Sequence, residues 1–162
     1  MKIPMGNNIF PSKLQKIIVF LIIILDQLTK LLVRKSFFLY ESRPVTSFLS
    51  LTYIHNTGMA WGFFQGKAYS NIAFIFIMLF ILACFAFFYK QITQHGGKLS
   101  EYAITLVFGG ALGNLIDRIF LGNVVDFIDF HFFPVFNVAD SCISVGGVML
   151  FISFLVRKKQ IL

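Results

Sequence analysis

The sequence has few charged residues, and acidic residues are the rarest of them. Only 13% of its 162 residues are Asp, Glu, Lys or Arg, and 7 of these are acidic. A soluble domain averages about 25% charged residues, so the composition argues against a soluble globular protein. Hydrophobic residues make up 57% of the chain and include 22 phenylalanines. This is typical of an integral membrane protein, and the length fits one compact domain.

Cysteine is also scarce. The two cysteines, Cys84 and Cys142, lie in apolar stretches and form no CxxC motif, and no histidine lies at ligand spacing from them. We therefore predict no disulfide and no metal site, and we expect no cofactor.

The net charge of +7 would suggest nucleic-acid binding in a soluble protein. Here the Lys and Arg residues lie at the ends of apolar stretches, where membrane topology and lipid headgroups account for them. Nucleic acid is therefore not an expected partner.

Four apolar stretches predict four transmembrane helices in a single membrane-embedded domain. Each is close to the about 20 residues that a helix needs to cross the hydrocarbon core. The first stretch follows a basic start, as in a signal peptide, but no small-x-small cleavage site follows it, so we predict an uncleaved helix. The predicted helices cover about residues 17–34, 70–89, 99–121 and 137–156.

The distribution of basic residues predicts the orientation. Eight of them flank the predicted helices on the side of both termini, and four flank them on the other side. Because Lys and Arg are in excess on the cytoplasmic side, both termini should be cytoplasmic. The loop of about residues 35–69 should face outward, and its alternating segment "LSLTYIH" predicts a short strand. Residues 90–98, "KQITQHGGK", predict a short polar hairpin with a Gly-Gly break on the cytoplasmic side.

Polar residues inside the predicted helices are informative, because a charge within a membrane is costly. The first group is "DQLTK", in which Asp26 and Lys30 lie four residues apart and can pair on one helix face. Such a pair can neutralise the charges of a helix end at the membrane interface, or it can support a polar site. The residues of this segment favour neither alternative.

The second group is "GGALGNLIDR". Asn114, Asp117 and Arg118 share a helix face, and Gly109 and Gly113 form a GxxxG pair that allows another helix to approach closely. The segment fits helix packing with a structural Asp–Arg pair. It also fits a site in which Asn114 orients a substrate backbone.

The third group is "NVVDFIDFHFFPVFNVADS". Pro134 predicts a helix start near Asn137, which resembles an N-cap followed by the first-turn acid Asp140. Asp140 can thus simply complement the helix dipole, and Asp126 or Asp129 can be an interfacial charge. Considered together, the three groups and Asn56 of the outer loop reach the same membrane depth, which favours a common site.

Two carboxylates at such a site can act as an acid and a base. If Asp126 or Asp129 meets Asp140 in a low dielectric, the two cannot both ionise comfortably, and they share a proton. The ionised member can then activate water while the protonated member polarises an amide carbonyl. Two alternatives stay open: a small proton-coupled transporter that uses the same carboxylates, and a non-catalytic helical assembly factor that uses the Gly-rich helix face.

Five blocks of the sequence, in order along the chain, resemble the motifs of lipoprotein signal peptidase, also called signal peptidase II. The resemblance implies an intramembrane aspartic endopeptidase of the bacterial cytoplasmic (inner) membrane, with its active site toward the outer leaflet. Such enzymes remove the signal peptide from diacylglyceryl-modified prolipoproteins by cleaving on the N-terminal side of the lipidated Cys. The blocks are "DQLTK" at 26–30, "HNTGMAWG" at 55–62, "GGALGNLIDR" at 109–118, "VVDFID" at 124–129 and "FNVADS" at 136–141.

The predicted fold class is an all-α polytopic membrane protein with four transmembrane helices, and the resemblance adds a small extracytoplasmic β-containing cradle in the outer loop. It also implies a catalytic dyad of Asp126 and Asp140, which leaves Asp129 as an interfacial charge. The other positions that it implies support the dyad or bind substrate: Asp26, Lys30, Asn56, Gly58, Ala60, Gly110, Asn114, Arg118, Asn137 and Ala139.

The expected partners are a diacylglyceryl prolipoprotein, membrane lipid and an inhibitor of the globomycin type, and we expect a monomer. The phenylalanines between the two acids should form an apolar rim that excludes water from the dyad and raises the pKa of one carboxylate. These are Phe127, Phe130, Phe132, Phe133 and Phe136.

Overall fold

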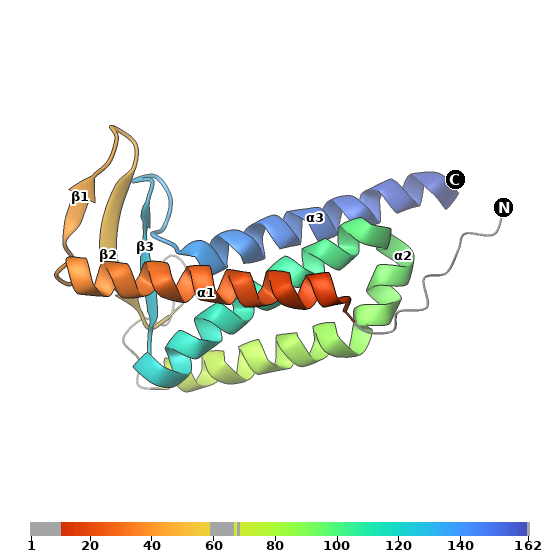
Figure 1. Ribbon diagram of the computed structural model, residues 1–162, viewed down its shortest axis with the longest axis horizontal. Coiled ribbons are helices and arrows are strands. Elements are labelled where there is room, and N and C mark those ends of the chain that lie inside the picture. Colours follow the sequence, from red (N-terminus) through yellow and green to blue (C-terminus); the bar gives the residue numbers. More distant parts are fainter. Residues whose placement is uncertain (1–10, 59–66, 68, 162) are drawn as a thin grey trace.

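The computed structural model describes residues 11–58, 67 and 69–161. Within these residues the helices run along one another and a small sheet covers one end of the bundle (Figure 1). The start of α1 and the end of α3 lie at the opposite end (Figure 1). The elements, in chain order, are α1 (Lys13–Ser36), β1 (Ser42–Pro44), β2 (Ser50–Asn56), α2 (Ser70–Leu121), β3 (Val124–Asp129) and α3 (Val138–Ile161).

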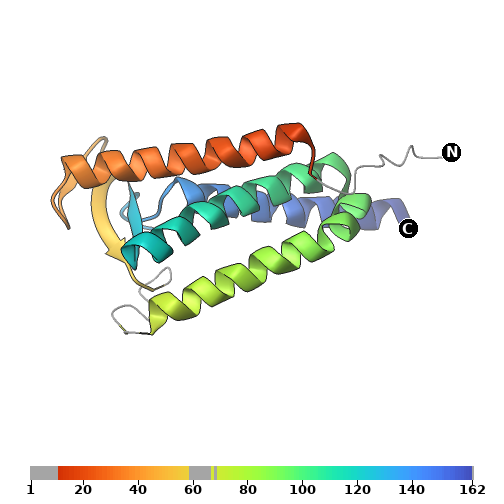
Figure 2. The same ribbon diagram turned by 60° about the horizontal axis from the view of Figure 1, so that its bottom comes forward.

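Helix α2 consists of two arms that reverse direction at a glycine. Gly97 has non-helical angles, φ 61° and ψ −156°, in a region that glycine enters at little cost. The first arm, Ser70–Gln94, and the second arm, Gly96–Leu121, run out and back (Figure 1 and Figure 2). The chain thus reverses at the predicted Gly-Gly break, but the predicted hairpin over residues 90–98 is too long, because its polar residues continue the two helices.

Both arms and the segment Val138–Val156 of α3 are long and apolar enough to cross a membrane. Helix α1 is not among these candidate spans, although it has 24 residues. Every 18-residue window of α1 holds at least three charged residues. Two of them, Asp26 and Lys30, are 0% and 2% exposed and form an ion pair of 2.8 Å inside the protein. The structure thus confirms a mainly helical membrane protein with a small sheet, and it accounts for the charges of α1.

The second arm of α2 is the centre of the helical bundle. Of the residues in its apolar stretch, 61% are buried, against 6% in the first arm. A Cβ added at Gly109 would meet Ile22 of α1, and one added at Gly110 would meet the backbone carbonyl of Ala139 in α3. These glycines therefore allow α1 and α3 to approach the second arm from two sides.

The sheet is antiparallel with the strand order β1-β2-β3. The predicted strand in "LSLTYIH" is confirmed as β2, which pairs with β3 so that Ile54 lies opposite Asp126. Strand β3 was not predicted, although its "VVDFID" segment is rich in β-branched and aromatic residues. Phe127 packs in a buried cluster with Val33, Tyr53 and Val125. The expectation that Phe127 belongs to the apolar rim of the dyad is therefore wrong, because this side chain packs between the sheet and the end of α1.

Candidate active site

Asp126 and Asp140 line one cavity, although they come from different elements. Asp126 lies in β3 and is 1% exposed, and Asp140 lies in the first turn of α3. The cavity has a volume of about 370 Å³ and lies where the sheet meets the two arms of α2 and the start of α3. Its polar lining also includes Asn56, Asn114 and Arg118. The cavity thus brings together the second and third polar groups and Asn56, which the sequence separates by up to 84 positions.

Asn137 connects the two carboxylates. Its Oδ1 accepts a hydrogen bond from the backbone N–H of Asp140 at 2.8 Å, and its own N–H donates to Asp140 Oδ2 at 3.4 Å. This is the predicted N-cap with a reciprocal first-turn acid. The side-chain Nδ2 of Asn137 donates to Asp126 Oδ1 at 2.7 Å. Asp140 therefore serves as a capping residue and faces the cavity at the same time.

Two further amides bind the other carboxylate oxygens. Asn56 Nδ2 donates to Asp126 Oδ2 at 2.9 Å, and Asn114 Nδ2 donates to Asp140 Oδ1 at 2.7 Å. These donors are neutral, so they orient the carboxylates and add no positive charge.

The surroundings of Asp126 change its proton affinity. Burial in the protein and the nearby Asp140 carboxylate raise the pKa of Asp126 to about 7, while the amides of Asn56 and Asn137 and the charge of Lys30 oppose this rise. A carboxyl group with a pKa near 7 can hold a proton at neutral pH. The pair is therefore suited to share one proton between an acid and a base.

Lys30 fixes the direction of the Asn114 amide. Its Nζ contacts Asp26 Oδ2 at 2.8 Å and Asp117 Oδ2 at 3.0 Å, and it donates to Asn114 Oδ1 at 2.9 Å. Because Oδ1 of Asn114 accepts from Lys30, its Nδ2 must point the other way, toward Asp140. The three donors of the ammonium group thus have three acceptors in a buried setting.

Asp26 positions the start of α3. Its Oδ1 accepts from the backbone N–H of Ala139 at 2.9 Å, next to Gly110 and Gly113 of the second arm. Ala139 is fully buried. Of the two alternatives for "DQLTK", the contacts fit the support of a polar site, because both Asp26 and Lys30 bind residues of the site.

Asp117 and Gln27 belong to this network and were not among the predicted site residues. Asp117 Oδ2 accepts from the backbone N–H of Val125 at 3.1 Å, next to Asp126, and Gln27 Nε2 donates to Asp117 Oδ1 at 3.0 Å. Of the two alternatives for "GGALGNLIDR", the structural pair of Asp117 with Arg118 is not found, because Asp117 pairs with Lys30. The sequence contained one signal for this pairing. Lys30 lies in a predicted transmembrane helix, and both Asp26 and Asp117 are acidic residues of such helices that could pair with it.

Arg118 and Gly58 form one edge of the cavity. Arg118 Nη2 donates to the Gly58 carbonyl at 2.7 Å, and the guanidinium lies 4.7 Å from the ring centre of Phe74. The N–H of Gly58 donates to Asn56 Oδ1 at 3.0 Å, which directs the Asn56 amide nitrogen toward Asp126. The predicted site residue Ala60 lies outside the described residues.

Asp129 is held apart from this cavity. Thr52 Oγ1 and the backbone N–H of His131 each donate to it at 2.8 Å. Among the predicted rim residues, Phe133 and Phe136 line the cavity of Asp126 and Asp140, and Phe130 stacks on Phe136. Phe132 is 78% exposed.

The chain is similar to known bacterial membrane peptidases. The family model described as Signal peptidase (SPase) II matches residues 18–156. The lipoprotein signal peptidase of Caldanaerobacter subterraneus subsp. tengcongensis is 44% identical over 136 residues, which cover 83% of this chain and 90% of the relative. That of Bacillus pumilus is 40% identical over 149 residues, which cover 89% and 94%.

A solved structure, described as a bacterial membrane enzyme determined by the in meso method, has the same fold. Its TM-score is 0.83 and its sequence identity is 35%, with 91% of this chain and 90% of that chain covered. A second structure described in the same way has a TM-score of 0.79 and 33% identity, with coverage of 88% and 92%.

Proposed function

Because the chain belongs to the signal peptidase II family, we propose that it is an intramembrane aspartic endopeptidase with Asp126 and Asp140 as its catalytic dyad. Membership of this family makes it a bacterial membrane protease of prolipoproteins, and the transporter alternative finds no support in the comparisons. The aspartic mechanism rests mainly on one observation: Asn137 binds both carboxylates of a single cavity, Asp126 through its side-chain Nδ2 and Asp140 through its backbone N–H.

The reaction needs one proton shared by two carboxyl groups. The ionised member takes a proton from water, which attacks the scissile carbonyl, while the protonated member donates a hydrogen bond to that carbonyl oxygen. The tetrahedral intermediate then collapses, the C–N bond breaks, and a carboxyl group passes its proton to the leaving nitrogen. The products are a signal peptide with a free carboxylate and a lipoprotein whose lipidated Cys carries a free amine.

The supporting residues have a role in this scheme. Asn56, Asn114 and Asn137 orient the carboxylate oxygens, and Lys30 with Asp26 holds Asn114 and the start of α3 in place. Arg118 fixes the Gly58 carbonyl at the edge of the cavity, where a substrate backbone would lie. Such fixed geometry lowers the barrier because the donors need no rearrangement during the reaction.

The expected orientation has both termini in the cytoplasm and the dyad near the outer leaflet. The excess of basic residues near the termini supports it, as does the position of the sheet at the end of the bundle away from the start of α1 (Figure 1). A diacylglyceryl group would stay among the acyl chains, where each buried CH₂ contributes about 0.8 kcal/mol, and would deliver the Cys to the cavity. An inhibitor of the globomycin type is expected to compete there, with the protein acting as a monomer.

The test is cleavage by the purified protein in proteoliposomes. A diacylglyceryl-modified prolipoprotein should yield two products by mass spectrometry, separated at the bond before the lipidated Cys, and globomycin should suppress both. The same precursor without lipid should stay intact. Equal cleavage of both precursors, or of neither, would contradict the proposed function.

A further inference from the structure

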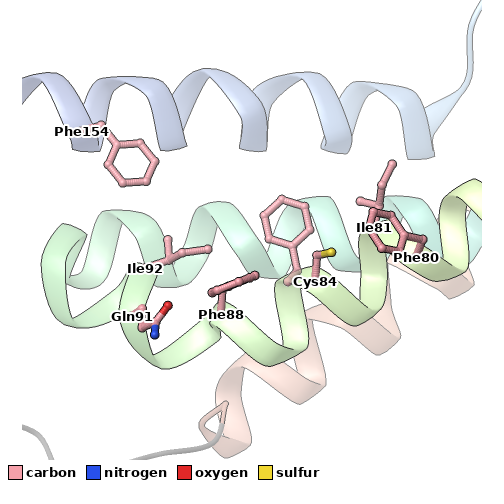
Figure 3. Close-up of a pocket in the computed structure, with 8 residues that line it drawn as sticks. Phe80, Ile81, Cys84, Phe88, Gln91, Ile92 and Phe154 are labelled. Atoms are coloured by element: carbon pink, nitrogen blue, oxygen red, sulfur yellow. The ribbon is translucent and has the colours of Figure 1, made fainter.

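An apolar groove separates the first arm of α2 from α3. Its volume is about 500 Å³, and Figure 3 shows Phe154 of α3 directed toward the first arm across this space. Gln91 lies at the end of the groove nearer the reversal at Gly97. The lining residues are Phe80, Ile81, Cys84, Phe85, Phe88, Gln91, Ile92 and Phe154.

The groove lies beyond the cavity of the dyad along the same pair of helices. Phe74, Ile77 and Met78 of the first arm line the dyad cavity, and Ile81 and Cys84 follow them at helical spacing in the groove. These residues therefore form one face of the first arm, which runs from the dyad to Gln91.

The facing side of α3 is open between the two spaces. Ser144 lines the dyad cavity, and a Cβ added at Gly147 one turn later would meet no atom within 4 Å. Phe154 lies two turns beyond Gly147 on the same face. Gly147 therefore places no side chain on this face of α3 between the dyad cavity and the apolar groove. The space along this face, between the first arm of α2 and α3, is called the seam below.

Protein covers little of the first arm. Only 6% of the residues in its apolar stretch are buried, and these include Leu82, which packs on Ala111 and Leu115 of the second arm. An apolar transmembrane partner could therefore lie along it without displacing any part of the fold.

The length of the seam fits the hydrophobic region of a signal peptide. Phe154 follows Asp140 by 14 residues (154 − 140), which is about 21 Å of helix. The hydrophobic region of a signal peptide has about 7 to 15 residues, or about 10 to 22 Å when helical. This region precedes the cleavage site and crosses the membrane from the cytoplasmic side.

We propose that the seam between the first arm of α2 and α3 binds the hydrophobic region of the signal peptide as a helix. This inference rests on the proposed function, since the scissile bond must lie at Asp126 and Asp140. With the scissile bond at the dyad, the apolar residues that precede the bond extend along the seam. The basic start of the signal peptide then reaches the level of Gln91. A free acyl chain or a second copy of this chain has no such attachment to the dyad, so the substrate itself is the favoured occupant.

The first experiment fills the seam with a side chain and compares two substrates. Gly147→Phe places a ring in the open seam, whereas Val148→Phe places the same ring on the neighbouring face, where Val148 is already 58% exposed. The substrates are a full diacylglyceryl prolipoprotein and a diacylglyceryl-Cys peptide with only a few residues before the Cys. Gly147→Phe should raise KM about tenfold for the full substrate with kcat unchanged. It should leave the short substrate unaffected, and Val148→Phe should match wild type with both.

The wild-type protein separates failure of the inference from failure of the proposed function. If wild type cleaves neither substrate, the proposed function fails and the inference with it. If wild type cleaves both but the two variants behave alike, or Gly147→Phe slows both substrates equally, the function stands and the inference is overturned.

A second measurement does not depend on the activity of these variants. A photoreactive amino acid is placed at position 84 or at the exposed position 83 of an Asp126→Asn protein, which should bind substrate without cleaving it. Light should link position 84, and not position 83, to the hydrophobic region of the prolipoprotein. An adduct of position 84 with phospholipid or with a second copy of the chain, and none with substrate, would contradict the proposal.

Discussion

Asn137 Nδ2 lies 2.7 Å from Asp126 Oδ1, and this contact ties the N-cap of α3 to a carboxylate of β3. The same side chain accepts the backbone N–H of Asp140 through its Oδ1. One amide therefore sets the positions of both candidate catalytic acids, and the helix start and the dyad geometry depend on the same residue.

The first prediction separates the capping role of Asn137 from its contact with Asp126. Serine is also a good N-cap, so Asn137→Ser should retain about 1 kcal/mol more unfolding free energy than Asn137→Ala. Its shorter hydroxyl should not reach Asp126, and cleavage should fall about 100-fold. The measurements are the initial rate of prolipoprotein cleavage and thermal unfolding in detergent. Asn137→Ala, which loses both roles, is the matched comparison, and wild-type cleavage by Asn137→Ser would contradict the assigned contact.

The second prediction concerns the pH dependence of cleavage. Burial and Asp140 raise the pKa of Asp126 to about 7, so the shared proton is lost as the pH rises above this value. The rate should fall above about pH 7, by about tenfold per pH unit at the alkaline end. A rate that keeps increasing up to pH 9 would be incompatible with a shared proton.

Asn56 provides a directional test of the same titration. Its hydrogen bond to Asp126 lowers the pKa of that group, because the bond favours the ionised form. Asn56→Ala should therefore raise the pKa of Asp126 and shift the alkaline limb of the rate profile to higher pH. A shift to lower pH would show that the amide does not stabilise the carboxylate.

The third prediction concerns the buried charge of Lys30. Lys30→Met removes the cation and leaves Asp26 and Asp117 buried without it. Breaking a buried ion pair in this way should cost about 3 to 5 kcal/mol of unfolding free energy. Lys35→Met, at an exposed position of the same helix, should change it by less than about 0.5 kcal/mol. Similar unfolding curves for the two variants would contradict the network.

The fourth prediction compares two glycines in helices. A methyl group at Gly110 would press against the backbone carbonyl of Ala139, so Gly110→Ala should destabilise the fold by about 1 to 3 kcal/mol. At Gly147 the added Cβ meets no atom within 4 Å, and Gly147→Ala should stabilise its helix by about 0.5 to 1 kcal/mol. Opposite shifts in the unfolding temperature are expected, and a shift of the same sign in both variants would contradict the packing.

Local patterns in the sequence predicted the parts of the structure that depend on local physics. The apolar stretches, the alternation in β2 and the N-cap at Asn137 each depend on neighbouring residues, and all three were found. Strand β3 was missed because a short strand is stabilised by its partner, here β2, which lies some 70 residues earlier. The hairpin over 90–98 was predicted too long because polarity suggested a loop, while a single residue, Gly97, reverses the chain.

The partners of the polar residues could not be read from the sequence. Asp26 and Lys30 are four residues apart, so their pairing was expected, but the third member, Asp117, comes from another helix. Because Asp117 and Arg118 are adjacent in the sequence, a pair between them was one alternative, whereas Arg118 binds the distant Gly58 carbonyl. The burial of Phe127 depends on how the sheet covers α1, so the sequence did not distinguish it from the phenylalanines of the rim.

The most direct test of the account is prolipoprotein cleavage by the variants Asp126→Asn and Asp140→Asn. Each should lose at least about 1000-fold in cleavage rate. In each variant only one carboxyl group remains, and it cannot activate water and donate a proton at the same time. Asp129→Asn, which changes an acid outside the cavity, is the matched control and should retain cleavage. All three proteins should accumulate in the membrane to the level of wild type. Cleavage at the wild-type rate by Asp126→Asn or by Asp140→Asn would contradict the proposed dyad.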